Sequence, residues 1–164
     1  MNGIDNTVLA RIDELQLNYI DALDSRDMQA WLATFSEMPQ ASYVCTTAES
    51  VQANLPVALI LDDCRARLED RVTFVDKIWT GTYQEMRTRH VIQRTRCSAA
   101  GANRYEVRTN FIIAFSPSDT GIAEILATGV YQDAVIVEGD AAKFLSKKAV
   151  TDISKLPHYI VFPL

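Results

Sequence analysis

The spacing of apolar residues changes once along this chain, near Gly81, and that change constrains the fold more than any other feature. Before it, apolar residues recur at steps of three and four, which is the helical period. After it the period is two, as in the alternation over residues 105–115. Helices followed by hairpin-connected strands predict an α+β fold, in which N-terminal helices pack on one face of a curved antiparallel sheet. We expect residues 1–164 to form a single domain.

Three helices are predicted in the first half. The first covers residues 8–23 and can be capped by Asp5 or Asn6. The second follows the capping residues around Asp27 and ends by Pro39; its apolar stripe includes two aromatic residues that we place in the core, Trp31 and Phe35. A third is expected to begin near Pro56, with an apolar stripe formed by Leu59, Ile60, Cys64 and Leu68.

The second half reads as a run of strands. Residues 88–97 and 105–115 form the first two, and a longer strand covers residues 122–137, with Gly129 predicted to form a bulge or bend. A hairpin turn at residues 138–140 leads to a last strand at 144–150. An earlier strand is expected within residues 41–47.

Charge and cysteine content exclude several classes of protein. The formal net charge of −5 argues against a nucleic-acid partner. Cys45, Cys64 and Cys97 are too widely spaced to indicate a zinc site or a disulfide framework. Three unpaired thiols are what we expect of a protein in a reducing compartment. Because no segment resembles a signal peptide or a membrane span, we expect a cytoplasmic protein with no membrane partner.

Metal ligands are scarce. A Rieske cluster needs two Cys and two His, and a non-haem iron triad needs two His and a carboxylate. The chain has only two histidines, His90 and His158, and no cysteine stands near either one in the sequence. No glycine-rich nucleotide motif is present either. We therefore expect no cofactor and no metal in this chain.

His90 is the main candidate for acid/base chemistry. It lies on a predicted strand and could act as a general acid or base in a sheet-lined pocket, oriented by Asp133 or Asp62. Tyr43 is a further candidate for the same pocket. The alternative, which we favour, is a structural histidine that is hydrogen-bonded within the sheet or at a subunit contact.

Arginines crowd the first two strands of the sheet. They could pair with acidic residues across the strands, or they could form an interface with another protein, which we favour slightly. The aromatic residue Trp79 and the apolar tail LPHYIVFPL are further interface candidates, although the tail could dock on its own domain. The interface candidates are Arg87, Arg89, Arg94, Arg96, Arg108, Trp79, Tyr159 and Phe162.

Several segments together resemble one known family. They are YIDALDSRDMQAWLATF, DDCRARLEDRV, MRTRHVIQ, VRTNFIIAFS, GVYQD and AKFLSKKAVTD. In this order they are similar to the beta, or small, subunits of Rieske-type aromatic-ring-hydroxylating oxygenases, and the likeness spans nearly the whole chain. Within that family the chain resembles small subunits that act with carboxylated aromatics, such as those of salicylate 5-hydroxylase, and anthranilate and benzoate dioxygenases are neighbouring possibilities.

The resemblance implies a cone-shaped fold like that of nuclear transport factor 2 and ketosteroid isomerase. It implies a structural subunit of an α3β3 hexamer, whose partners are large subunits and other copies of itself. The [2Fe-2S] Rieske cluster and the mononuclear Fe(II) are then expected in the large subunit, with electrons supplied from NADH.

Two alternatives remain open at this stage. The first is a stand-alone isomerase or dehydratase of the same fold, with His90, Asp133 and Tyr43 as its acid/base groups. The second is a binding module whose pocket holds a small apolar molecule.

Overall fold

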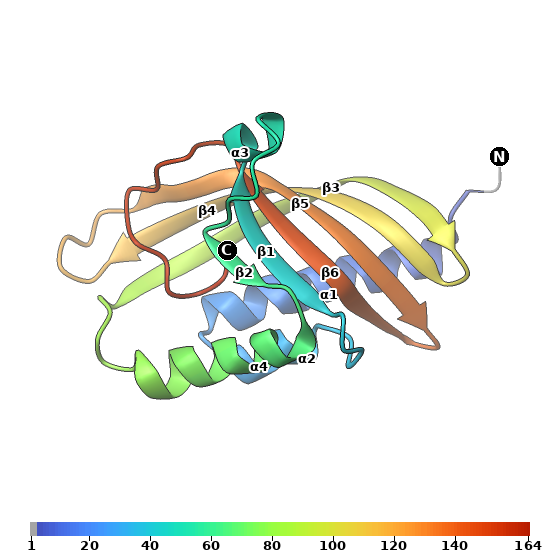
Figure 1. The fold of residues 1–164 in the computed structure, drawn as a ribbon, viewed down its shortest axis with the longest axis horizontal. Coiled ribbons are helices and arrows are strands. Elements are labelled where there is room, and N and C mark those ends of the chain that lie inside the picture. Colours follow the sequence, from blue (N-terminus) through green and yellow to red (C-terminus); the bar gives the residue numbers. More distant parts are fainter. Residues whose placement is uncertain (1–2) are drawn as a thin grey trace.

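The computed structural model describes residues 3–164. Six strands form one curved sheet in the order β2-β1-β6-β5-β4-β3, and the helices α1, α2 and α4 lie on one side of it (Figure 1). All neighbouring strands are antiparallel except β1 and β6, which run parallel. The elements are α1 (Asn6–Asp24), α2 (Met28–Ala33), β1 (Ser42–Thr47), α3 (Ala48–Gln52), β2 (Ile60–Asp62), α4 (Arg65–Thr73), the π-helix η1 (Phe74–Ile78), β3 (Met86–Gly101), β4 (Arg104–Pro117), β5 (Glu124–Glu138) and β6 (Ala141–Thr151).

The first two helices begin at the predicted caps. The Asp5 carboxylate accepts the backbone N–H of Thr7 at 2.7 Å, and the Asp27 carboxylate accepts that of Ala30 at 2.8 Å. The apolar stripe of α1 is buried, as the helical spacing predicted. Trp31 and Phe35 lie in the core with their ring centroids 5.0 Å apart.

The helix predicted to begin near Pro56 is wrong. Residues 60–62 instead form strand β2, which pairs with β1, and α4 begins only at Arg65. The stripe of apolar residues misled the prediction because Ile60 and Asp62 point inward while Leu61 points out, which is the period of a strand. The Asp62 carboxylate is held by two hydrogen bonds from Arg71, at 2.9 and 3.0 Å.

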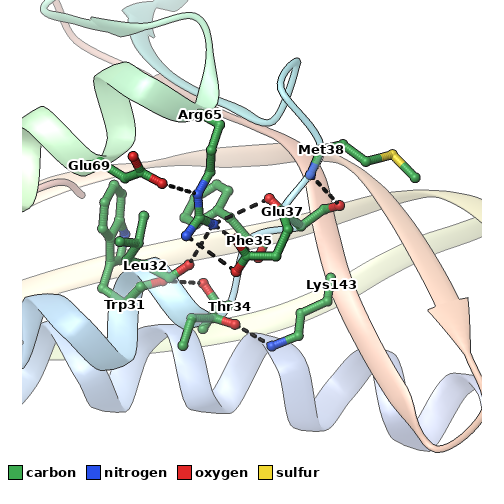
Figure 2. A network of polar contacts seen from close by, with 11 residues as sticks. Trp31, Leu32, Thr34, Phe35, Glu37, Met38, Arg65, Glu69 and Lys143 are labelled. Carbon is green, nitrogen blue, oxygen red and sulfur yellow. Dashed lines mark hydrogen bonds and ion pairs between the residues drawn. The ribbon is translucent and has the colours of Figure 1, made fainter.

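Arg65 fastens the start of α4 to the segment that follows α2 (Figure 2). Its Nε donates to Glu69 at 2.9 Å, and its Nη1 lies 3.3 to 3.5 Å from the backbone oxygens of Leu32, Phe35 and Ser36. The Leu32 oxygen also accepts the backbone N–H of Phe35 at 3.1 Å, so the guanidinium adds further hydrogen bonds to the carbonyl groups at and just after the end of α2.

The long strands alternate as predicted. In β4 the side chains of Val107, Thr109, Phe111, Ile113 and Phe115 face the helices, and the residues between them face away. The turn predicted at residues 138–140 is also present, with a left-handed glycine in it (φ +59°).

Gly129 does not form the predicted bulge. It pairs in register with Phe111 on one side and Thr151 on the other, and the register shifts of β5 lie elsewhere, next to Ile113 of β4 and at Ala134. A Cβ atom at position 129 would come within 2.8 Å of the Phe111 ring and would also strike the backbone oxygen of Val150. Glycine is therefore needed here for close packing between strands, not for a bend.

The apolar tail docks on its own domain. We call residues 153–164 the C-terminal strap. The backbone oxygen of Leu164 accepts hydrogen bonds from the hydroxyls of Tyr19 at 2.8 Å and Tyr43 at 3.2 Å, and Leu164 is 2% exposed. Among residues 3–164, no helix is both long and apolar enough to cross a membrane.

Candidate functional site

A small cavity of about 30 Å³ lies on the helix side of the sheet, beneath the C-terminal strap. Strands β3, β4 and β5 and the end of α1 supply its walls, and strap residues 159–164 close it. Most lining side chains are apolar or aromatic, and the few polar groups include Arg26 and His90. A mainly apolar cavity with a few convergent polar groups is the usual form of a small-molecule site.

His90 is held against this cavity by Asp24, the last residue of α1. The Asp24 carboxylate accepts three hydrogen bonds: from His90 Nδ1 at 2.6 Å, from the His90 backbone N–H at 3.0 Å and from the Thr88 hydroxyl at 2.9 Å. The His90 side chain is 3% exposed and that of Asp24 is 14% exposed. The ring of His90 is therefore fixed in orientation by a neighbouring carboxylate, as in many acid/base sites.

Two opposing effects act on the pKa of Asp24. Burial raises this pKa. The hydrogen bonds from His90 and Thr88 and the attraction of the His90 ring lower it by more than burial raises it, so the net shift is downward. Asp24 is therefore a carboxylate at neutral pH. It accepts the Nδ1 proton, so in the neutral ring Nε2 carries the free lone pair.

Nε2 of His90 is buried and has no hydrogen-bond partner among the described residues. It lies on the side of the ring opposite to Nδ1, and His90 lines the cavity. An unpaired buried nitrogen is costly unless another group satisfies it. The arrangement can accept a proton or a hydrogen bond from a molecule in the cavity.

The acid/base group predicted from the sequence is not assembled. Asp133 and Asp62 were proposed to orient His90, but Asp62 pairs with Arg71 and Asp133 pairs with Lys147. The Tyr43 hydroxyl is bound to the backbone of Leu164 instead. Asp24 takes the orienting role, so both orienters named in the acid/base alternative, Asp133 and Asp62, were wrong.

Asp133 and Lys147 form a second polar group, deep between α1 and the sheet. Lys147 Nζ lies 2.9 Å from Asp133 Oδ2 and 3.0 Å from the side-chain oxygen of Gln16, and Gln16 also donates to Oδ2 at 2.6 Å. The side chains of Lys147 and Asp133 are both 0% exposed. Nζ also lies 4.0 to 4.5 Å from the ring centroids of Tyr19, Tyr131 and Phe144.

Burial shifts both pKa values of this pair. It lowers the pKa of Lys147 to about 8, against the attraction of Asp133, and it raises the pKa of Asp133, against the attraction of Lys147. The three aromatic faces offset part of the cost of burying the ammonium group. We interpret this pair as structural, because it is enclosed by protein on all sides.

The candidate arginines divide between the two faces of the sheet. Arg94 faces the helices and forms a two-pronged ion pair with Asp13 of α1, at 2.6 and 3.0 Å. The other four face away from the helices and form no ion pair within residues 3–164; they are Arg87, Arg89, Arg96 and Arg108. Cross-strand pairing with acidic residues therefore does not account for those four.

The aromatic interface candidates also differ in exposure. Trp79, at the end of η1, is 38% exposed and packs on Phe74, and Tyr159 of the strap is 53% exposed. Phe162 is only 9% exposed because its ring lies against Tyr83 and beneath the Arg26 guanidinium. Phe162 therefore belongs to the core of its own domain and offers little surface to a partner.

The donor side chains of this chain do not fit a Rieske cluster or a mononuclear iron. Within residues 3–164 no three His, Cys, Asp or Glu side chains are grouped to hold a metal. Both ring nitrogens of His158 already contact protein oxygens, and Cys45 is buried. We assign no step of any reaction to a metal in this chain.

Two important residues were missed in the sequence. Asp24 looked like a capping residue between two helices. Only its position at a helix end, before a predicted pocket, could have suggested that its carboxylate binds His90. Lys147 was not singled out within the predicted last strand at residues 144–150. The signal that could have found it is weak, since a β-bulge at Leu145 moves Lys147 to the inner face.

Comparison with known proteins extends across most of the chain. The model of a family described as "Ring hydroxylating beta subunit" matches residues 20–158. The small subunit of anthranilate 1,2-dioxygenase from Burkholderia cepacia is 24% identical over 150 residues, which cover 92% of this chain and 90% of the relative.

Solved structures agree with the predicted fold. The beta subunit of benzoate 1,2-dioxygenase from Burkholderia mallei has a TM-score of 0.72 and 25% identity, with 93% of each chain covered. A chain of naphthalene 1,2-dioxygenase, crystallised with indole in the active site, has a TM-score of 0.70 and 16% identity, covering 96% of this chain and 85% of that one. The curved sheet with helices on one face is thus a fold that this chain shares with them.

Proposed function

We propose, because this chain belongs to the ring-hydroxylating beta subunit family, that it is the structural subunit of an α3β3 oxygenase in the breakdown of aromatic compounds. In that assembly the large subunits carry the Rieske cluster and the mononuclear iron, and electrons come from NADH. Within residues 3–164 no three His, Cys, Asp or Glu side chains are grouped to hold a metal, and this supports placing both iron centres in the large subunit. Its own contribution is then to bind the large subunits and other copies of itself.

The observation that carries this proposal is a basic hollow of about 490 Å³ on the helix-free face of the sheet. Arg96 of β3 stands directly opposite Arg108 of β4, and Lys148 of β6 lines the same hollow. Glu106 is the acidic side chain of this lining, because the Asp133 carboxylate is turned inward to Lys147, so basic side chains are in excess. Like charges directly opposite each other destabilise a sheet. Carboxylates of a partner subunit would relieve this repulsion, so the hollow suits an acidic segment of another chain.

The same face carries exposed apolar side chains. Val91 and Ile112 pair across β3 and β4 and are 63% and 45% exposed. Arginine combined with apolar surface is typical of protein interfaces. Arg87 and Arg89 lie on the same face of β3, so we place the main contact with the large subunit on this face. Trp79 and Tyr159 are exposed too, but they lie at the end of η1 and in the strap, outside this face, so they would serve a separate contact.

For the substrate class we propose a carboxylated aromatic compound such as salicylate. Two similar proteins are named as subunits of enzymes for anthranilate and benzoate, and both of those molecules are carboxylated aromatic rings. Salicylate belongs to the same chemical class. The pocket that binds this substrate lies in the large subunit.

The test is co-expression with a Rieske-type large subunit from the same source, followed by mass measurement in solution. We expect a hexamer of two chain types that contains iron only when the large subunit is present. A lone chain that stays monodisperse, ignores the large subunit and turns over substrate would contradict the proposal. It would favour the stand-alone isomerase or dehydratase instead.

Charge reversal tests the basic hollow itself. Arg96→Glu with Arg108→Glu should weaken co-assembly by at least about tenfold, because two charge-assisted contacts change sign. Lys77→Glu is the matched control, since it makes the same type of charge change at an exposed position on η1. Unchanged co-assembly of the double variant would place the interface elsewhere.

A further inference from the structure

We propose that this domain holds a ligand site of its own at His90, which binds a small aromatic ring bearing a hydroxyl group and which the C-terminal strap covers. This site does not depend on the role of the chain in an oxygenase. It uses the cavity beneath the strap, whereas the proposed subunit contact uses the opposite face of the sheet.

The hydroxyl requirement follows from the state of the His90 ring. Asp24 binds Nδ1 and the backbone N–H of the same residue, so the ring cannot rotate without breaking the 2.6 Å contact. Nε2 then stays in one place, buried and without a partner among the described residues, on a side chain of a residue that lines the cavity. In the neutral ring it accepts a hydrogen bond, and a phenolic O–H is a strong donor of small size.

The aromatic requirement follows from other residues that line the same cavity. The Phe162 ring of the strap lies edge-to-face with Tyr83, at 5.4 Å between centroids, and the Arg26 guanidinium lies 4.2 Å from the Phe162 centroid. An aromatic edge and a cation together form a slot that recognises any flat ring. Met86, Ile113 and Leu126 add apolar surface to the same cavity.

A ring can enter only if the strap moves. With the strap in place the cavity of about 30 Å³ has room for one or two water molecules and not for a six-membered ring. The ligand therefore competes with Phe162 for the slot between Tyr83 and Arg26.

The strap is attached in a way that allows this movement. Within the described chain, no backbone-to-backbone hydrogen bond joins residues 153–164 to the rest of the domain. Side chains hold it instead, including the bond from the Gln84 N–H to the Tyr159 hydroxyl at 2.8 Å and those between Leu164 and two tyrosines. Opening the strap therefore breaks no backbone ladder, and its main cost is to withdraw the buried residues 162–164 from the core.

The experiment is a titration of the full chain with 4-fluorophenol and, separately, with fluorobenzene, followed by fluorine NMR. We expect 4-fluorophenol to bind at least about tenfold more tightly than fluorobenzene, which is the ratio given by one net hydrogen bond. The ring nitrogen signals of His90 should shift with 4-fluorophenol alone. Equal affinity for the two probes, or no shift of the His90 nitrogens, would overturn the proposal.

Two variants locate the site. His90→Phe should remove the preference for 4-fluorophenol, so that the two probes bind alike. Phe162→Ala should tighten binding several-fold because the ligand no longer displaces a phenyl ring, and Phe74→Ala, an exposed ring on η1, is the matched control that should change nothing. Weaker binding to a folded Phe162→Ala protein would overturn the covering role of the strap; if that variant does not fold, the wild-type nitrogen shifts still decide the question.

Discussion

The helix side of the sheet carries two acid–base pairs with opposite surroundings. Lys147 and Asp133 are enclosed by three aromatic rings and Gln16, and neither side chain has any exposed surface. His90 and Asp24 lie at the edge of the core, where Asp24 is 14% exposed and His90 meets a cavity.

The difference separates a structural pair from a binding pair. In the enclosed pair, the ammonium group meets the carboxylate, an amide oxygen and three rings, so no outside molecule can reach it. Each pair keeps one buried atom without a partner among the described residues, Asp133 Oδ1 and His90 Nε2, but of the two residues only His90 lines the cavity beneath the strap. A strongly perturbed pKa therefore does not identify the functional group here, because the pKa of Lys147, which burial lowers to about 8, belongs to the enclosed pair.

The largest effect should come from breaking the enclosed pair. Lys147→Met leaves the Asp133 carboxylate buried without its cation, and we expect it to lower the free energy of unfolding by about 3–5 kcal/mol. The double variant Lys147→Met with Asp133→Leu should recover most of that loss, because no uncompensated charge remains. Urea unfolding at pH 7 measures both. If the double variant is as unstable as the sum of the single variants, the two residues are not coupled.

A smaller loss should follow from Asp24→Asn. The amide keeps the shape of the side chain but loses the charge that three donors share, which should lower the free energy of unfolding by about 1.5–3 kcal/mol. Asp21→Asn, an exposed position on the same helix, is the control and should change stability by less than about 0.5 kcal/mol. Equal effects of the two changes would mean that Asp24 does not anchor His90.

Acid gives a second test of Asp24. Its pKa is lowered in the folded chain below the ordinary value of 3.8, so its stabilising contribution is present above pH 3.8 and is lost as pH falls through the folded pKa. The stability difference between the wild type and Asp24→Asn should therefore shrink with acid. A difference that stays constant to pH 2 would contradict the lowered pKa.

Alkaline conditions should raise the free energy of unfolding through the enclosed pair, whereas acid removes the contribution of Asp24. Between pH 8 and 10.5 the unfolded chain keeps the Lys147 proton and the folded chain releases it, so the free energy of unfolding gains at most about 1.4 kcal/mol per pH unit relative to Lys147→Met. Burial raises the pKa of Cys45 to about 12, so this thiol lowers the stability of both proteins above pH 9, and the difference between their curves removes its contribution. Parallel pH curves for the two proteins would contradict the lowered lysine pKa.

The smallest effects should come from removing one threonine hydroxyl beside each pair. Thr88→Val removes a 2.9 Å hydrogen bond to Asp24 and should cost about 1 kcal/mol. Thr109→Val removes only a 3.4 Å contact with Gln16 and should cost less, because a hydrogen bond of that length is weak. Thermal unfolding of both variants measures the order, and a reversed order would show that the Gln16 contact is the stronger one.

The sequence predicted the layers of this fold well because period and turn chemistry are local. The alternation in β4 and the glycine turn after β5 needed only neighbouring residues for their interpretation. The segment before α4 failed for the opposite reason. Ile60–Asp62 becomes a strand because it pairs with β1, an earlier strand that is not adjacent to it in the sequence.

The site was predicted only in part. His90 stood out by its residue type and strand position, but its partner Asp24 is 66 residues away and joins it only when α1 packs on β3. The enclosed lysine was hidden by a bulge that shifts the alternation of β6 by one residue. Both failures concern contacts that depend on three-dimensional packing, about which local periodicity carries no information.

The parallel pairing of β1 with β6 sets an order of events during synthesis on the ribosome. Strands β3, β4, β5 and β6 can form hairpins with their neighbours as they emerge, but Ser42–Thr47 of β1 finds Ser146–Thr151 only after all the strands between them have been made. Until then β1 has only three-residue β2 as a sheet partner. A nascent chain that pauses before β6 therefore exposes a strand edge, and that is the moment at which chaperones should bind it.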